Sequence, residues 1–145
     1  RECVGRDAAV LLKKIGVNVG PEIRCIICET AFEHPFVQNE LMMPILPIVR
    51  VSDIDEAIDL AVKAEHGCRH TAHMHSKNID HLTRFARAVE TTIFVKNAPS
   101  YAGLGFGGEG HTTFTIAGPT GEGLTSARSF TRYRRCVMAD SFRII

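Results

Sequence analysis

Two stretches in the middle of the chain carry the clearest alternation of apolar and polar residues. In the first, apolar residues recur every three or four positions and form one helical stripe: Ile54, Ala57, Ile58, Ala61 and Val62. Ser52 and Asp53 precede this stripe as candidate N-caps, and Gly67 lies where the helix is expected to end. In the second, the helix predicted over Asn78–Val89 carries its inward-facing residues at Ile79, Leu82, Phe85, Ala86 and Val89.

Shorter apolar runs predict strands around these helices. They are expected at Ile23–Cys28, Ile48–Val51, Thr71–Ser76 and Thr92–Val95. The second strand is expected to begin late, because Pro44 and Pro47 cannot donate to a strand ladder. A further helix is predicted over Asp7–Ile15, with Gly16 placed to cap its C-terminus. Strands alternating with helices of this length indicate βαβ units, so the predicted fold class is α/β, a mostly parallel open sheet with flanking helices.

Three segments lack this pattern. Glu29–Met43 is too irregular for a helix or strand and is expected to be a loop. Gly103–Gly123 holds eight of the twelve glycines, which predicts no regular element but a long ordered loop or a disordered linker. The tail, Ser126–Ile145, mixes arginines with apolar residues and is predicted to form a helical turn leading into a strand.

Composition narrows the classes of protein that the chain can belong to. Its 145 residues suit one domain or part of one, and 45% hydrophobic with 23% charged residues is ordinary for a soluble globular protein. A net charge of +1 gives no electrostatic reason to expect nucleic acid or an anionic membrane as a partner. No apolar run approaches the roughly 18 residues of a membrane span. The chain opens Arg1-Glu2-Cys3, without a methionine or a signal peptide, so we expect a fragment or a processed piece.

The cysteines favour a reducing compartment. There are five of them, scattered along the chain: Cys3, Cys25, Cys28, Cys68 and Cys136. An odd, scattered set is not a disulfide framework and indicates the cytoplasm. Cys25 and Cys28 form a lone CxxC inside an apolar run, which we interpret as a buried strand and not as a metal or redox motif.

Two motifs suggest metal or nucleotide binding, and the evidence for each is weak. His70, His73 and His75 lie within six residues, but in a strand His73 and His75 share one face while His70 points to the other. This division argues against a metal site, and no metal is expected. The GxGxxG-like string Gly103–Gly108 neither follows an apolar strand tightly nor opens a helix, so it does not predict a dinucleotide-binding turn.

Several later motifs carry a resemblance to one family. They are Glu40–Ile48, His70–Ala72, Asn97–Gly103, Gly107–Gly110, Pro119–Arg128 and Arg134–Val137. Together they resemble the CoA-acylating propionaldehyde and acetaldehyde dehydrogenases of bacterial microcompartments, over essentially the whole chain. The resemblance implies the C-terminal part of an aldehyde dehydrogenase catalytic domain over residues 1–125, followed by an oligomerisation strand tail over residues 126–145.

This resemblance also implies a reaction. A short aliphatic aldehyde is oxidised with NAD⁺, and the acyl group passes through a cysteine thioester to coenzyme A. The nucleophilic cysteine and the nucleotide-binding fold are expected upstream of this segment, so the isolated chain is expected to be inactive. The partners implied are the aldehyde, coenzyme A and further copies of the same protein. The location implied is the cytoplasm, with the interior of a microcompartment as an alternative.

Site residues follow from the same resemblance. Glu40 matches a glutamate that accepts hydrogen bonds from the nicotinamide ribose, since a carboxylate can accept from two adjacent hydroxyls. His70 matches a histidine near the thiol, where an imidazole of near-neutral pKa can act as a base. Pro99, Ser100 and the glycines Gly107 and Gly108 are expected to shape the acyl or CoA pocket.

Two other interpretations stay open at this point. The fragment can be a structural or oligomerising module without activity, or it can come from the dehydrogenase half of a bifunctional aldehyde–alcohol dehydrogenase. The residues do not choose between acetaldehyde and propionaldehyde or between NAD and NADP, and they do not give the size of the oligomer.

Overall fold

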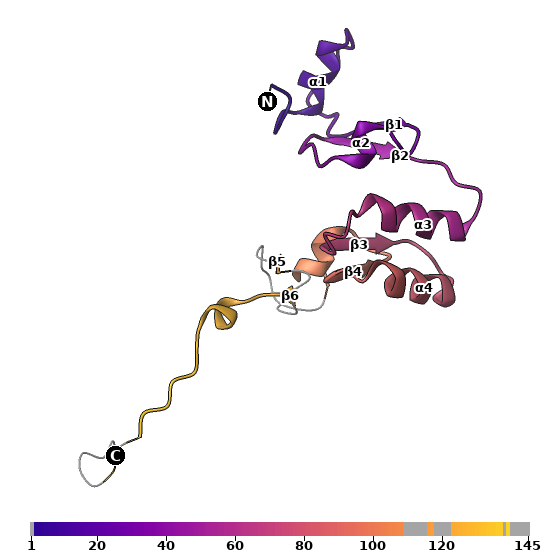
Figure 1. Cartoon of the computed structure of the whole chain (residues 1–145). Coiled ribbons are helices and arrows are strands. Elements are labelled where there is room, and N and C mark those ends of the chain that lie inside the picture. The colour runs from indigo at the N-terminus through magenta and orange to yellow at the C-terminus, as the bar shows by residue number, and fades with distance from the viewer. Residues whose placement is uncertain (1, 109–115, 118–122, 138, 140–145) are drawn as a thin grey trace. The chain divides into compact units, whose positions relative to one another are not determined.

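The fold was analysed in a computed structural model, which describes residues 2–108, 116–117, 123–137 and 139 (Figure 1). The chain divides into two compact units, residues 1–67 and residues 68–145. Each unit is described by itself below.

The first unit pairs two parallel strands. Its elements are α1 (Ala8–Lys14), β1 (Ile26–Glu29), α2 (Pro35–Gln38), β2 (Ile45–Ile48) and α3 (Ile54–Ala64). The register of β1 and β2 runs from Ile26 opposite Ile45 to Glu29 opposite Ile48. The strands are consecutive in the chain and parallel, so a crossover must join them, and α2 lies in it.

Capping explains where the long helices of the first unit begin and end. Gly16 adopts φ +82° after α1, and the following N–H, of Val17, donates to the carbonyl of Leu12 over 3.0 Å, as in a Schellman cap. At the start of α3, the Asp53 carboxylate accepts from the backbone N–H groups of Asp55 and Glu56, each at 2.9 Å. These hydrogen bonds hold the pKa of Asp53 below its ordinary value, and the bond from the N–H of Glu56 has the largest effect.

The second unit is built on one βαβ motif. Its elements are β3 (Thr71–Met74), α4 (Ile79–Val89), β4 (Ile93–Lys96), the 3-10 helix η1 (Ser100–Leu104), β5 (Ile116–Ala117), β6 (Gly123–Leu124) and the 3-10 helix η2 (Ala127–Phe130). β3 and β4 are parallel, with Thr71 opposite Ile93 and Met74 opposite Lys96, while β5 and β6 are antiparallel. α4 begins at the N-cap Asn78 and ends at Glu90, which adopts a left-handed conformation with φ 48°.

The β3–β4 pair is covered differently on its two faces. On one face, Phe94 meets Phe85 of α4 with ring centroids 5.5 Å apart. Ile93 and Val95 point to the other face, because side chains alternate along a strand, and both are only 6% exposed. Gly103 of η1 lies against these two side chains. α4 therefore packs on one face, and η1 packs on the opposite face.

The predicted helices and the parallel pairing are confirmed, with small shifts in the strands. β1 begins three residues after the predicted start, so Cys28 lies in a strand while Cys25 is exposed and precedes it. β2 occupies Ile45–Ile48 and not Ile48–Val51. Pro47 is tolerated inside β2 because the carbonyls of Pro44 and Ile48 accept from the N–H groups of Ile26 and Thr30, so the nitrogen of residue 47, on the alternate side of the strand, faces away from the ladder.

Two predictions of irregular structure are wrong in part. The segment Glu29–Met43 contains α2, which is capped by a hydrogen bond from the N–H of Phe36 to Nδ1 of His34 over 3.1 Å. Within Gly103–Gly123, the end of η1 and a short antiparallel pairing between β5 and β6 form despite the glycines. Neither element carries an apolar period: α2 is a short helix begun by its cap, and β5 and β6 pair across a short connection, with Ile116 opposite Leu124.

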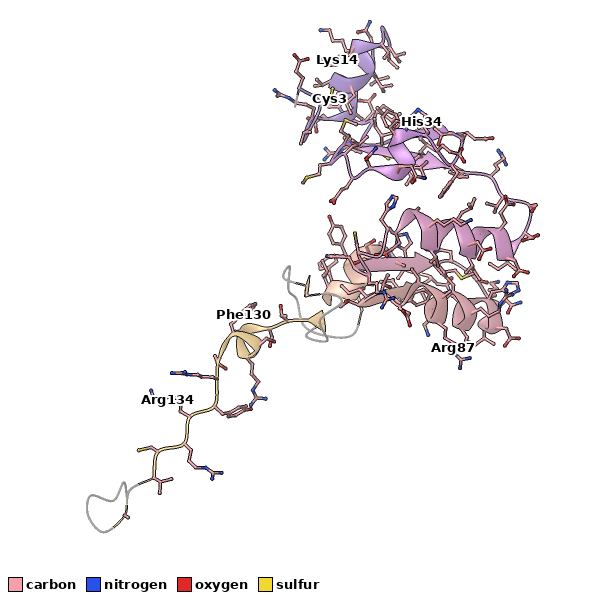
Figure 2. The ribbon with its side chains drawn as sticks, viewed as in Figure 1. Cys3, Lys14, His34, Arg87, Phe130 and Arg134 are labelled. Carbon is pink, nitrogen blue, oxygen red and sulfur yellow. The ribbon has the colours of Figure 1, made fainter. Side chains whose placement is uncertain are left out.

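The tail contains the predicted helical turn, η2. No helix or strand is formed by residues 131–137, and most of the predicted strand after them lies outside the described residues. Figure 2 shows the side chains of Phe130 and Arg134 on this tail, where Phe130 is 70% and Tyr133 91% exposed. Among the described residues, no helix is long and apolar enough to cross a membrane. The predicted division at residues 125 and 126 stays a prediction.

Candidate functional site

Three polar side chains of the second unit, His73, His75 and Ser100, lie together near the face of β3 and β4 that η1 covers. His73 lies opposite Val95 in the parallel register and so shares its face. The hydroxyl of Ser100, the first residue of η1, lies 3.4 Å from Nδ1 of His73. The rings of His73 and His75 meet edge to face with centroids 6.0 Å apart, which confirms that these two histidines share a face.

A side-chain clamp fixes the loops that follow the two strands. The Asn97 side chain accepts from the N–H of Ser76 over 2.7 Å and donates to the carbonyl of Ser76 over 2.8 Å. Ser76 therefore makes its backbone hydrogen bonds with a side chain, which explains why β3 ends at Met74 and not at the predicted Ser76. Asn97 itself adopts φ 54°, a left-handed conformation that asparagine tolerates well.

Close packing of glycines holds η1 in place. A Cβ atom at Gly103 would overlap the Ile93 side chain, and one at Gly108 would overlap the carbonyl oxygen of Ala102. Gly107 adopts φ +73°, where other residues are strained. Gly107 and Gly108 thus allow the chain after η1 to turn back against it, a structural reason for the glycines beside any role in a pocket.

His70 lies at the other end of β3. It is exposed, and its Nδ1 lies 2.6 Å from the hydroxyl of Thr71. Its carbonyl accepts from the N–H of Ile93 over 3.1 Å, which ties the residue to the start of β4. The preceding turn is held by an ion pair of 2.9 Å between Arg69 and Glu90. The backbone at His70 is therefore fixed, and one ring nitrogen has a hydroxyl partner.

The remaining predicted residues divide between the two units. Glu40 belongs to the first unit, between α2 and β2, and is exposed. Its carboxylate oxygens are accessible, as a ribose-binding role requires. Pro99 belongs to the second unit, where it precedes η1 with φ −68° and ψ 159°, and its carbonyl accepts from the N–H of Ala102 over 2.9 Å. The structure thus brings Pro99, Ser100 and the glycines together on η1 and the turn after it.

The opposite face of the β3–β4 pair is mainly apolar. A hollow of about 350 Å³ there is lined by Ile79, Leu82, Thr83, Ala86, Arg87, Phe94 and Lys96. Arg87, labelled in Figure 2, and Lys96 supply its charges, and its lining contains no histidine, cysteine or carboxylate side chain. The chemistry that the second unit offers is therefore on the η1 face and around His70.

Cysteines and metal ligands form no cluster in the part of the chain that is described. All five cysteines are free thiols, and no group of three or more histidine, cysteine, aspartate or glutamate side chains is arranged to hold a metal there. Asn97 and His73 were not among the residues expected at the site. The parallel register of β3 and β4 could have indicated His73, because it places His73 on the face of the pair against which η1, the segment after β4, packs.

Comparison with known proteins gives consistent results. The family described as "Aldehyde dehydrogenase family" matches residues 14–134. The chain is 57% identical, over all of its 145 residues, to the acetylating acetaldehyde dehydrogenase EutE of Salmonella typhimurium, of which it spans 31%.

Two solved structures are similar in fold and sequence. One is the propionaldehyde dehydrogenase of Rhodopseudomonas palustris with bound CoA and an acylated cysteine, with 64% identity and a TM-score of 0.87 over 94% of this chain and 31% of that one. The other is a propionaldehyde dehydrogenase from the fucose utilisation microcompartment of Clostridium phytofermentans, with 61% identity and a TM-score of 0.86 over 97% of this chain and 32% of that one. The chain thus spans about a third of the length of the proteins it matches.

Proposed function

Because the chain belongs to the aldehyde dehydrogenase family, we propose that the protein containing it is a CoA-acylating aldehyde dehydrogenase acting on short aliphatic aldehydes. The observation that carries the proposal is the identity of 64% to a propionaldehyde dehydrogenase solved with CoA and an acylated cysteine. The identity of 57% to an acetylating acetaldehyde dehydrogenase supports the same class of acceptor. The reaction converts an aldehyde, NAD⁺ and CoA to an acyl-CoA, NADH and a proton.

In this proposal, the nucleophilic cysteine and the nucleotide-binding fold lie in the part of the protein that precedes this segment. Bound NAD⁺ supplies the hydride acceptor. Glu40 orients the nucleotide, since its exposed carboxylate can accept from two adjacent ribose hydroxyls. Pro99, Ser100, Gly107 and Gly108 shape the pocket for the acyl group or the arm of CoA, and the packing of η1 on β4 gives that pocket a rigid wall.

His70 is proposed as the base that takes the proton from the CoA thiol. A thiol with an ordinary pKa of about 8.5 is mostly protonated at neutral pH, so an imidazole that removes its proton assists its attack on the thioester. The hydroxyl of Thr71, 2.6 Å from Nδ1 of His70, orients the ring. The backbone tie to Ile93 keeps the residue at the start of β3.

Substitution of His70 tests this role in the intact protein. His70→Ala should lower the CoA-dependent rate by about 10²–10⁴-fold, the usual contribution of a lost acid–base group. The pH dependence of the CoA-dependent rate should differ between wild type and this variant, because only wild type carries the base. His75→Ala is the matched control and should stay within a few-fold of wild type. An unchanged rate in His70→Ala would contradict the assignment, and equal losses in both variants would point to a shared structural role.

Assembly and location complete the proposal. Tyr133 and Val137, 91% and 78% exposed, carry apolar surface, which suits a strand that another copy of the protein covers. We therefore propose a homo-oligomer in which residues 133–142 form the interface strand. We place the protein in the cytoplasm or inside a microcompartment, with the relative from a fucose utilisation microcompartment in support.

A further inference from the structure

The contact between Ser100 and His73 has no part in the mechanism above. We propose that His73 is a positioning residue that fixes the hydroxyl of Ser100 and thereby sets how tightly the site binds its acyl or CoA ligand. The inference rests on the proposed function, in which Ser100 belongs to the ligand pocket. It concerns binding and not the chemical step, because the contact joins His73 to Ser100 and His73 has no assigned part in proton transfer.

The ring of His73 is aimed by the strand that carries it. β3 alternates its side chains, so His73 points to the face that η1 covers, in register with Val95. From there Nδ1 lies 3.4 Å from Oγ of Ser100. A neutral imidazole can accept a hydrogen bond from the hydroxyl at this nitrogen, or donate one to it in the other tautomer.

Ser100 is brought to the ring by backbone features on both of its sides. Before it, the Asn97 side chain is clamped to Ser76, and Pro99 has a fixed φ, so little freedom remains between clamp and hydroxyl. After it, Gly103 packs on β4 so closely that no Cβ fits. The backbone of Ser100 is therefore fixed, and the contact with His73 restricts the remaining rotation of the Ser100 side chain.

Substitution of His73 by asparagine or by glutamine tests whether the residue acts through its hydrogen bond to Ser100 or only by filling space. Asparagine at position 73 keeps a hydrogen-bonding atom close to the place of Nδ1, whereas glutamine places one close to Nε2. In the intact protein, His73→Ala and His73→Gln should raise the KM of the ligand that Ser100 contacts by about 3- to 10-fold, the range of a single hydrogen bond. His73→Asn should restore most of the loss. The kcat should stay within a factor of about two, because the reacting groups are unchanged.

A double-mutant cycle completes the experiment. The KM values of the aldehyde and of CoA are measured in wild type, Ser100→Ala, His73→Ala and the double variant. His75→Ala is the control for ring packing, because it removes the ring beside His73 but neither partner of the contact with Ser100. The same KM should rise in both single variants, and the double variant should be no worse than Ser100→Ala alone. Additive effects, or a His73→Asn variant as impaired as His73→Ala, would overturn the inference while leaving the proposed function intact. A wild-type protein that forms no acyl-CoA would overturn both.

Discussion

The packing of η1 against β4 makes Gly103→Ala an informative perturbation. The added methyl group would overlap the Ile93 side chain and lie 3.0 Å from Cγ2 of Val95. Both neighbours are β-branched and about 6% exposed, so neither can rotate away within the core. The strain must therefore be relieved by movement of η1 away from the sheet. Overpacking of this kind costs about 1–3 kcal/mol.

Amide hydrogen exchange measures the local effect of this destabilisation. Amides of the segment that donate to carbonyls within it include those of Ala102, Gly105 and Phe106, over 2.9, 3.2 and 3.1 Å. If the substitution lowers the free energy of local opening of η1 by this amount, exchange of these amides should accelerate by about 5- to 150-fold, since about 1.4 kcal/mol is a factor of ten. The measurement is mass spectrometry of peptides covering residues 99–108 of the intact protein.

Gly20→Ala is a matched control for this substitution. The three atoms nearest to a Cβ at Gly20 all belong to the carboxylate end of the Glu22 side chain, which can move aside. This variant should leave exchange in residues 99–108 unchanged. Wild-type exchange in Gly103→Ala would refute the reasoning, because it would mean that the sheet accommodates the methyl group without moving η1.

Three further predictions concern the cap of α3, the cofactor and the assembly. The pKa of Asp53 is lowered in the folded chain, chiefly by the hydrogen bond from the N–H of Glu56, so its stabilisation is present above the unfolded pKa and lost as pH falls through the folded one. Asparagine can also cap a helix but has no acidic proton, so the melting temperature of Asp53→Asn should decline less than that of wild type below about pH 4. Parallel curves of melting temperature against pH for the two proteins would contradict this. Glu40→Gln should weaken NAD⁺ binding by about 1.5–3 kcal/mol while the aldehyde KM changes little, whereas unchanged NAD⁺ kinetics would make Glu40 a surface residue. Deletion of residues 130–145 should lower the mass found by light scattering, and an unchanged mass would exclude an interface there.

The sequence predicted best the elements that carry their own local signals. α3 was identified by its apolar stripe and by the candidate caps Ser52 and Asp53, and the structure begins it directly after Asp53. α4 was identified by its apolar stripe alone, and it begins one residue after the predicted start because Asn78 is its N-cap. Gly16 likewise marked the end of α1. Such features involve residues within one or two turns of each other, so they are visible in a single sequence.

Elements that depend on distant partners were predicted less well. The end of β3 is set by Asn97, 21 residues away from Ser76, and no local pattern reports that clamp. The position of β2 depends on which carbonyls face β1, which the two prolines alone do not reveal. For the site, the resemblance supplied His70 and Ser100, but only the packing of η1 on β4 shows that His73 reaches the Ser100 hydroxyl.

The most direct test of the proposed function is product analysis with two competing acceptors. The intact protein is supplied with propionaldehyde and NAD⁺, with and without CoA, and NADH, propionyl-CoA and propionate are quantified together. The account predicts that NADH and propionyl-CoA form in equal amounts when CoA is present, and that turnover nearly stops without it. Propionate formed at the same rate with or without CoA would contradict the account, because water and not the CoA thiol would then be the acyl acceptor.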